Sequence, residues 1–128
     1  MPATSPIDDV LTVRRPWGSF DVLLSNAPAT VKVITVAAGQ RLSLQRHQSR
    51  DEMWQVLDGL VDVEVDGQRT RPGPGQRVWV RRGATHRLGN SSDQPIHVLE
   101  VAFGDFDEDD IERLEDDYQR APAVTRSI

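Results

Sequence analysis

Short apolar runs rich in β-branched residues recur along this chain, and turn-forming residues separate them. The clearest turn is Asp66-Gly67, which closes an alternating run over residues 61–65 and predicts a β-hairpin. Many short strands at regular turn spacing, with no helical period between them, indicate an antiparallel barrel or jelly roll. The runs predicted as strands are residues 20–24, 31–37, 53–57, 61–65, 77–80, 86–88 and 95–103.

The length of 128 residues allows one domain with a single core. We expect this domain to span residues 14–120, between a flexible arm over 1–13 and a flexible tail over 121–128. The arm is rich in Pro, Ser, Thr and Asp and shows no helix or strand period. Trp17 stands near the start of the domain and is interpreted as a core residue, because large aromatic side chains mostly serve burial.

The composition excludes several classes of protein. No cysteine is present, so disulfides and thiolate metal sites are excluded, and any metal must be held by imidazole, carboxylate or amide groups. No apolar run approaches the length of a membrane span, and the first residues lack the features of a signal peptide, so we expect a cytoplasmic protein. No Gly-rich phosphate loop precedes Arg14, so the chain by itself is not expected to make a nucleotide sugar.

Acidic residues are concentrated near the C-terminus. Residues 105–120 hold nine acidic side chains and two arginines, so the rest of the chain is slightly positive although its net charge is −5. The remaining arginines are scattered, which argues against a nucleic-acid partner. We expect a helix at about residues 107–120, with Asp107 as its cap and an apolar stripe of Ile111, Leu114 and Tyr118. A packing helix with a solvated acidic face is preferred to an acidic tail that binds a partner.

One stretch carries a metal-ligand spacing: it reads Gln-Arg-His-Gln-Ser-Arg-Asp-Glu from Gln45 to Glu52. Alternate side chains of a strand share a face, so Gln45 and His47 project together and Glu52 can return to the same space after a bend. A second cluster of spaced glycines contains His86. The two clusters together resemble the paired motifs of the cupin superfamily, with Gln45 in the place of the usual first histidine. This resemblance implies a double-stranded β-helix, a jelly-roll barrel whose metal ligands would be Gln45, His47, Glu52 and His86.

The pattern Gln-x-His-x-x-Arg-x-Glu, which includes Arg50, is similar to the signature of type II mannose-6-phosphate isomerases. These are the cupin domains usually fused behind a mannose-1-phosphate guanylyltransferase. The likeness extends over about residues 14–120. It includes Arg-Pro-Trp-Gly-Ser-Phe from Arg15, Gly-Ala-Thr-His-Arg-Leu from Gly83 and Glu-Asp-Asp-Ile from Glu108.

The resemblance implies a metal-dependent isomerase that interconverts mannose 6-phosphate and fructose 6-phosphate through an enediol. Such an enzyme would feed GDP-mannose and polysaccharide precursor synthesis, and the family implies a homodimer. Arg50 matches the motif arginine, while Lys32 and Arg87 are further candidate catalytic cations. Zinc is the first choice of metal, followed by manganese, cobalt, nickel or iron.

Two alternatives stay open. Gln48, Ser49 and Met53 stand where the family commonly has histidine. These departures favour a non-catalytic, metal-containing module that binds a sugar phosphate or sugar nucleotide and assists a separate guanylyltransferase. Two histidines and one carboxylate also make the facial triad of non-haem iron oxygenases, although Gln45 argues against that function if it binds the ion.

Overall fold

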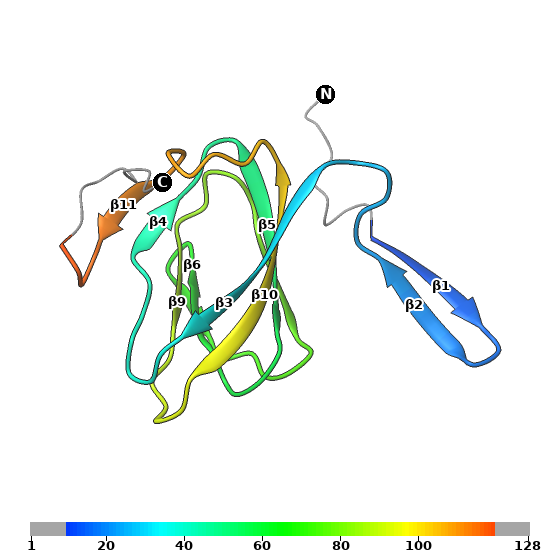
Figure 1. The fold of residues 1–128 in the computed structure, drawn as a ribbon, viewed down its shortest axis with the longest axis horizontal. Coiled ribbons are helices and arrows are strands. Elements are labelled where there is room, and N and C mark those ends of the chain that lie inside the picture. Colours follow the sequence, from blue (N-terminus) through cyan, green and yellow to red (C-terminus); the bar gives the residue numbers. More distant parts are fainter. Residues whose placement is uncertain (1–9, 120–128) are drawn as a thin grey trace.

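The computed structural model describes residues 10–119, and every regular element in that range is a β-strand (Figure 1). The predicted all-β architecture is therefore confirmed, and none of these residues forms a helix that could cross a membrane. The strands are β1 (Leu11–Arg15), β2 (Gly18–Val22), β3 (Ala29–Val36), β4 (Leu44–Arg46), β5 (Arg50–Val56), β6 (Asp62–Val65), β7 (Gln68–Thr70), β8 (Arg77–Val80), β9 (His86–Gly89), β10 (Ile96–Gly104) and β11 (Glu112–Glu115).

Two antiparallel sheets form the barrel. One has the strand order β3-β10-β5-β8 and the other the order β11-β4-β9-β6-β7. Alternation along each strand sends one set of side chains between the sheets, as expected for sheets with one buried face. The larger core cluster is made mostly of β-branched residues and fills one end of this space. Its buried members are Val36, Trp54, Val56, Val61, Val63, Val80, Leu88, Ile96 and Val98.

The hairpin predicted at Asp66-Gly67 is confirmed. β6 and β7 pair antiparallel around this turn, and Asp66 and Gly67 have φ angles of 48° and 81°. Two successive positive φ values are the geometry that Asp-Gly favours in a two-residue β-turn.

A second glycine is required for both backbone and packing reasons. Gly59 has φ of +70°, and a Cβ at this position would lie 2.7 Å from Cγ2 of Ile96 in the core. We expect Gly59→Ala to lower the free energy of unfolding by about 2 kcal/mol, measured by urea denaturation. Gly67→Ala is the matched control, because Gly67 has a similar φ of +81° and open space around its Cα. Equal losses in the two variants would show that the contact with Ile96 contributes nothing.

The helix predicted at residues 107–120 is wrong. A turn at Asp107–Asp110 leads into β11, which pairs antiparallel with β4. The free edge of β4 offers backbone hydrogen-bond partners, and this tertiary pairing overrides the local helical spacing. The acidic side chains here bind arginines of the barrel. The pairs are Arg46–Glu112, Arg87–Glu115 and Arg41–Asp117.

The N-terminal hairpin contradicts the interpretation of Trp17 as a core residue. β1 and β2 pair only with each other, and Figure 1 shows them extending away from the barrel. Trp17 lies in their connecting turn and its exposed fraction is 73%. Residues 11–13 of the predicted arm belong to β1, whereas residues 1–9 and the predicted tail over 121–128 lie outside the described residues.

Candidate metal centre

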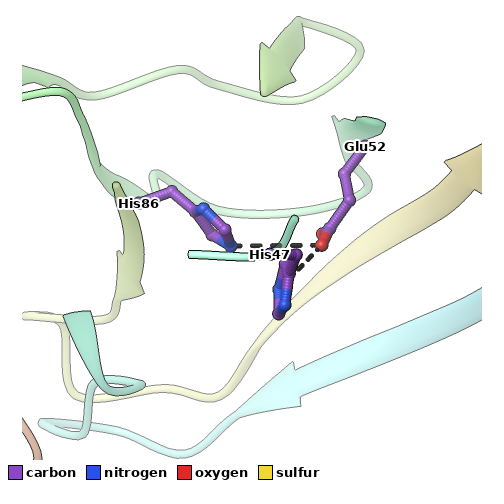
Figure 2. A group of neighbouring side chains, drawn as sticks. All are labelled: His47, Glu52 and His86. Carbon is purple, nitrogen blue, oxygen red and sulfur yellow. Dashed lines mark ion pairs between the residues drawn. The ribbon is translucent and has the colours of Figure 1, made fainter. Parts of the chain in front are cut away.

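Three side chains from both sheets converge inside the barrel (Figure 2). His47 directly follows β4, Glu52 lies on β5 and His86 lies on β9. Gln45 is the register partner of His86 across the β4–β9 pair, so the first motif and the second lie side by side. The bend at residues 48–49 returns the chain into β5, which confirms the expected approach of Glu52 to His47.

The triad is compact and buried. Nε2 of His47 lies 3.0 Å from Oε1 of Glu52, and Nε2 of His86 lies 4.0 Å from the same oxygen. One ligand atom from each residue falls within 4.8 Å of the others, and all three residues are at most 3% exposed. Two imidazole nitrogens and a carboxylate oxygen at such distances form a donor set that suits zinc and related divalent ions.

The hydrogen bonds of the two imidazoles fit metal binding. Nδ1 of His47 is 2.6 Å from the carbonyl oxygen of Asp110, and Nδ1 of His86 is 3.0 Å from that of Ala84. Each Nδ1 therefore carries the proton, and each Nε2 is the nitrogen that faces the site. Within residues 10–119, Nε2 of His86 has no hydrogen-bond partner although it is buried. A cation would satisfy this nitrogen, so the residues present fit a metal.

Asp110 holds the loop that carries His47. Its two carboxylate oxygens accept hydrogen bonds from the backbone N–H groups of Gln48 and Ser49, each at 2.9 Å. Its carbonyl oxygen accepts from His47. Asp110 thus fixes both the backbone next to His47 and the orientation of the ring, which makes it a positioning residue.

We expect Asp110→Ala to lower the free energy of unfolding by about 2 kcal/mol, because two backbone donors lose their partner. Zinc affinity should fall about tenfold, as is usual when a group that supports a ligand is lost. Urea denaturation and calorimetric zinc titration measure the two effects. Glu108→Ala is the control, since Glu108 is an exposed acid of the same segment. Unchanged zinc affinity in Asp110→Ala would contradict the positioning role.

The strand register places a second row of polar side chains beside the triad. Glu52 is opposite Ala102, and the next inward row joins Lys32, Glu100 and Trp54 across β3, β10 and β5. Nε1 of Trp54 donates to Oε2 of Glu52 at 3.3 Å and to Oε2 of Glu100 at 3.1 Å. Nζ of Lys32 lies 3.4 Å from Oε1 of Glu100. This row lies between the triad and the remaining residues of the apolar core, to which Trp54 itself belongs.

Burial and hydrogen bonding set the charges of these groups. Burial is the largest single effect on Glu52 and opposes its ionisation, but hydrogen bonding with His47 and Glu100 and the interactions with both imidazoles together outweigh it and hold the pKa of this carboxyl well below its usual range. Burial, followed by the adjacent charge of Glu52, raises the pKa of Glu100 to about 7. Burial lowers the pKa of His86, which favours the neutral ring that a metal requires.

Arg50 is the buried cation of the site. Its Nη2 lies 3.1 Å from Nε2 of His47, and its Nε lies 3.2 Å from Oε1 of Glu52. The ring of Phe106 packs against two cations, with its centroid 4.4 Å from Cζ of Arg50 and 5.0 Å from Nζ of Lys32. The sequence motif thus identifies a residue that contacts two members of the triad.

The other predicted residues occupy different places. The amide nitrogen of Gln45 lies 3.4 Å from Nε2 of His47, while its oxygen accepts from Ser43, so the amide must rotate if its oxygen is to bind an ion. Arg87 lies on the opposite face of β9 from His86, where it donates to Leu42 and Glu115. Lys32 contacts the barrel interior by its ion pair with the buried Glu100.

The positions that lack the family histidines are not equivalent. Met53 is fully buried in a separate cluster with Val101 and Phe103, on the face of β5 opposite to Glu52. A histidine at position 53 would therefore face away from the triad. Gln48 and Ser49 are exposed beside His47, and their backbone groups hold Asp110.

Sequence reasoning missed Glu100, Phe106 and the role of Asp110. Glu100 carried a usable signal, because an acidic residue at an inward position of an otherwise apolar strand is unusual. Asp110 belongs to the Glu-Asp-Asp-Ile motif that starts at Glu108, but the helical spacing of this segment does not indicate that its carboxylate holds the loop of His47.

The model of the mannose-6-phosphate isomerase C-terminal family matches residues 5–116. The chain belongs to this family. Its membership confirms the resemblance inferred from the Gln45 and His86 motifs, and it agrees with a jelly-roll barrel that holds a candidate metal triad.

Proteins similar to this member of the mannose-6-phosphate isomerase C-terminal family are much longer. Alginate biosynthesis protein AlgA of Pseudomonas aeruginosa is 42% identical over 109 residues, which cover 84% of this chain and 23% of that protein. A mannose-1-phosphate guanylyltransferase of Escherichia coli is 38% identical with the same coverage of 84% and 23%. The chain thus spans about a quarter of the length of these curated relatives.

Solved structures support the fold. A cupin 2 conserved barrel domain protein from Salinispora arenicola superposes with a TM-score of 0.55 at 24% identity, covering 74% of this chain and 76% of that one. A cupin protein from Bacteroides fragilis gives a TM-score of 0.55 at 21% identity, covering 59% and 65% of the two chains. The barrel is therefore a cupin barrel.

Proposed function

We propose that this domain is a metal-dependent aldose-ketose isomerase that interconverts mannose 6-phosphate and fructose 6-phosphate through an enediol. Family membership supports the substrate class, and the buried triad supports the metal. The observation that carries the proposal is the contact of Arg50 with His47 and Glu52, at 3.1 and 3.2 Å. A buried cation beside a metal centre suits a reaction in which negative charge develops on the substrate.

Each group has a distinct task in this proposal. A divalent cation held by the triad, zinc as the first choice, would polarise the substrate carbonyl and stabilise the enediolate. Arg50 would donate to a substrate oxygen on which charge develops. Lys32, whose side chain is 40% exposed, would bring positive charge toward the substrate phosphate from the solvent side. Phe106 packs against both cations and would exclude water from them.

The test is a coupled assay of mannose 6-phosphate isomerisation with protein that has been stripped of metal and reloaded with zinc or manganese. We expect turnover only with metal, and at least a hundredfold loss in Arg50→Ala and in His47→Ala. Arg69→Ala is the matched control, because Arg69 lies on β7 with 86% of its side chain exposed. Metal-loaded protein that leaves mannose 6-phosphate unchanged would refute the isomerase.

A binding module is the second candidate. One of the longer relatives is a mannose-1-phosphate guanylyltransferase, and this chain matches about a quarter of that protein. These facts favour a domain that binds a sugar phosphate or sugar nucleotide and assists a separate guanylyltransferase. Saturable binding of mannose 6-phosphate or GDP-mannose without turnover would select this function over the first.

A further inference from the structure

Two buried polar atoms inside the barrel have no hydrogen bond within the part of the chain that the structure describes. They are Nε2 of His86 and Oε1 of Glu100. A metal explains the nitrogen, but the candidate ligand cluster consists of His47, Glu52 and His86 and does not include Glu100. A buried acceptor is costly to leave without a hydrogen bond, so Oε1 of Glu100 can accept one from a ligand.

The neighbours of Glu100 fix its carboxyl group. Oε2 accepts from the indole of Trp54 at 3.1 Å, which leaves Oε1 as the oxygen available to a ligand. Nζ of Lys32 lies 3.4 Å from Oε1 as an ion pair. Glu100 itself is only 5% exposed, whereas the Lys32 side chain is 40% exposed. The ion pair therefore links this buried acceptor to a side chain that reaches solvent.

We propose that Glu100 is a substrate-contacting residue whose Oε1 accepts a hydrogen bond from a hydroxyl group of an open-chain sugar phosphate. This inference rests on the proposed function and deepens it. The polar row of Lys32, Glu100 and Trp54 forms the floor of the site, between the triad and the apolar core. A polyhydroxy chain offers donors along its length, so a substrate held at the metal can place one on this floor.

The chemistry of Glu100 also orients the substrate. Above its pKa of about 7 the Glu100 carboxyl is ionised, and it then repels a phosphate group, which carries negative charge and offers no donor of its own. The hydroxyl-bearing carbons therefore lie on the floor, and the phosphate lies toward the exposed end of Lys32. The hydrogen bond would select for a hydroxyl at one position of the carbon chain, which makes Glu100 a specificity determinant.

The test uses sorbitol 6-phosphate, an open-chain sugar phosphate that cannot isomerise, titrated calorimetrically into zinc-loaded protein at about pH 8.5, above the pKa of about 7 of Glu100. Glu100→Leu should bind it about tenfold or more weakly, the effect of one lost charge-assisted hydrogen bond. Affinities for zinc and for inorganic phosphate should stay within a factor of three. A deoxy analogue that lacks the contacted hydroxyl should bind the parent and Glu100→Leu equally well.

The outcomes separate this inference from the proposed function. Equal affinity of the parent and Glu100→Leu for sorbitol 6-phosphate would overturn the role of Glu100 alone. A parallel loss of zinc affinity would also overturn it, because Glu100 would then act through the metal. Absence of sorbitol 6-phosphate binding by the parent would overturn the role of Glu100, whereas the isomerase is refuted only if metal-loaded protein leaves mannose 6-phosphate unchanged. If Glu100→Leu does not fold, Glu100→Gln replaces it, with an expected loss of about threefold, and unchanged affinity again overturns the role.

Discussion

Replacing His86 by alanine is expected to weaken zinc binding by more than about 100-fold. This loss is larger than that expected when a residue that only hydrogen-bonds to a metal ligand is removed. His86 supplies one of only two imidazoles in the triad, and among residues 10–119 no group forms a hydrogen bond with its Nε2, so this nitrogen is available to an ion. The loss is measured by calorimetric titration or by competition with a chelator, on protein whose fold is verified by circular dichroism.

His97→Ala is the control for this experiment. His97 is the third histidine of the chain, and its Nδ1 lies 2.7 Å from Oδ2 of Asp58 in an exposed pair. Zinc affinity should be unchanged in this variant. A His86→Ala protein that retained zinc affinity to within tenfold of the parent would show that the ion binds elsewhere.

The pH dependence of stability is expected to reveal the buried carboxyl of Glu100. Its pKa is raised from 4.5 to about 7 in the folded protein by burial and by the charge of Glu52. Between these two values the unfolded chain loses the proton while the folded protein keeps it. Stability from this group is therefore complete below pH 4.5 and is lost as pH rises to about 7, a fall of about 3 kcal/mol.

The measurement is urea denaturation of metal-free protein at several pH values from 4.5 to 7.5, for the parent and for Glu100→Gln. The variant lacks the titrating group, so its stability relative to the parent should increase by about 3 kcal/mol across this range. Glu100→Leu should show the same relative change. Stability curves that run parallel in parent and variants would contradict a protonated Glu100 in the folded state.

Half of the triad could be predicted from local rules, because strand alternation and one bend bring His47 and Glu52 together. The pairing of Gln45 with His86 joins distant segments, and the family motif is what indicates this second imidazole. The strands could be predicted for a similar reason, since apolar periodicity and turns such as Asp66-Gly67 are local signals.

The remainder depends on pairings between distant segments. Ile111, Leu114 and Tyr118 have a helical spacing, but the free edge of β4 determines that residues 112–115 form a strand. Glu100 becomes part of the site only through its register with Lys32 and Trp54. Neither pairing is visible in a local window of sequence, so local spacing does not predict these roles.

The hydrogen bonds by which Asp110 holds the His47 loop affect the order in which the metal centre forms during synthesis. All three triad residues have been added to the chain once His86 is made, yet the carbonyl that orients His47 comes 24 residues later, from Asp110. At about 5 to 20 residues per second, that interval is about 1 to 5 seconds. A nascent chain would therefore contain all three ligand residues before the contact that orients His47 can form. An ion bound in that interval would be bound by a less constrained and less selective set of donors.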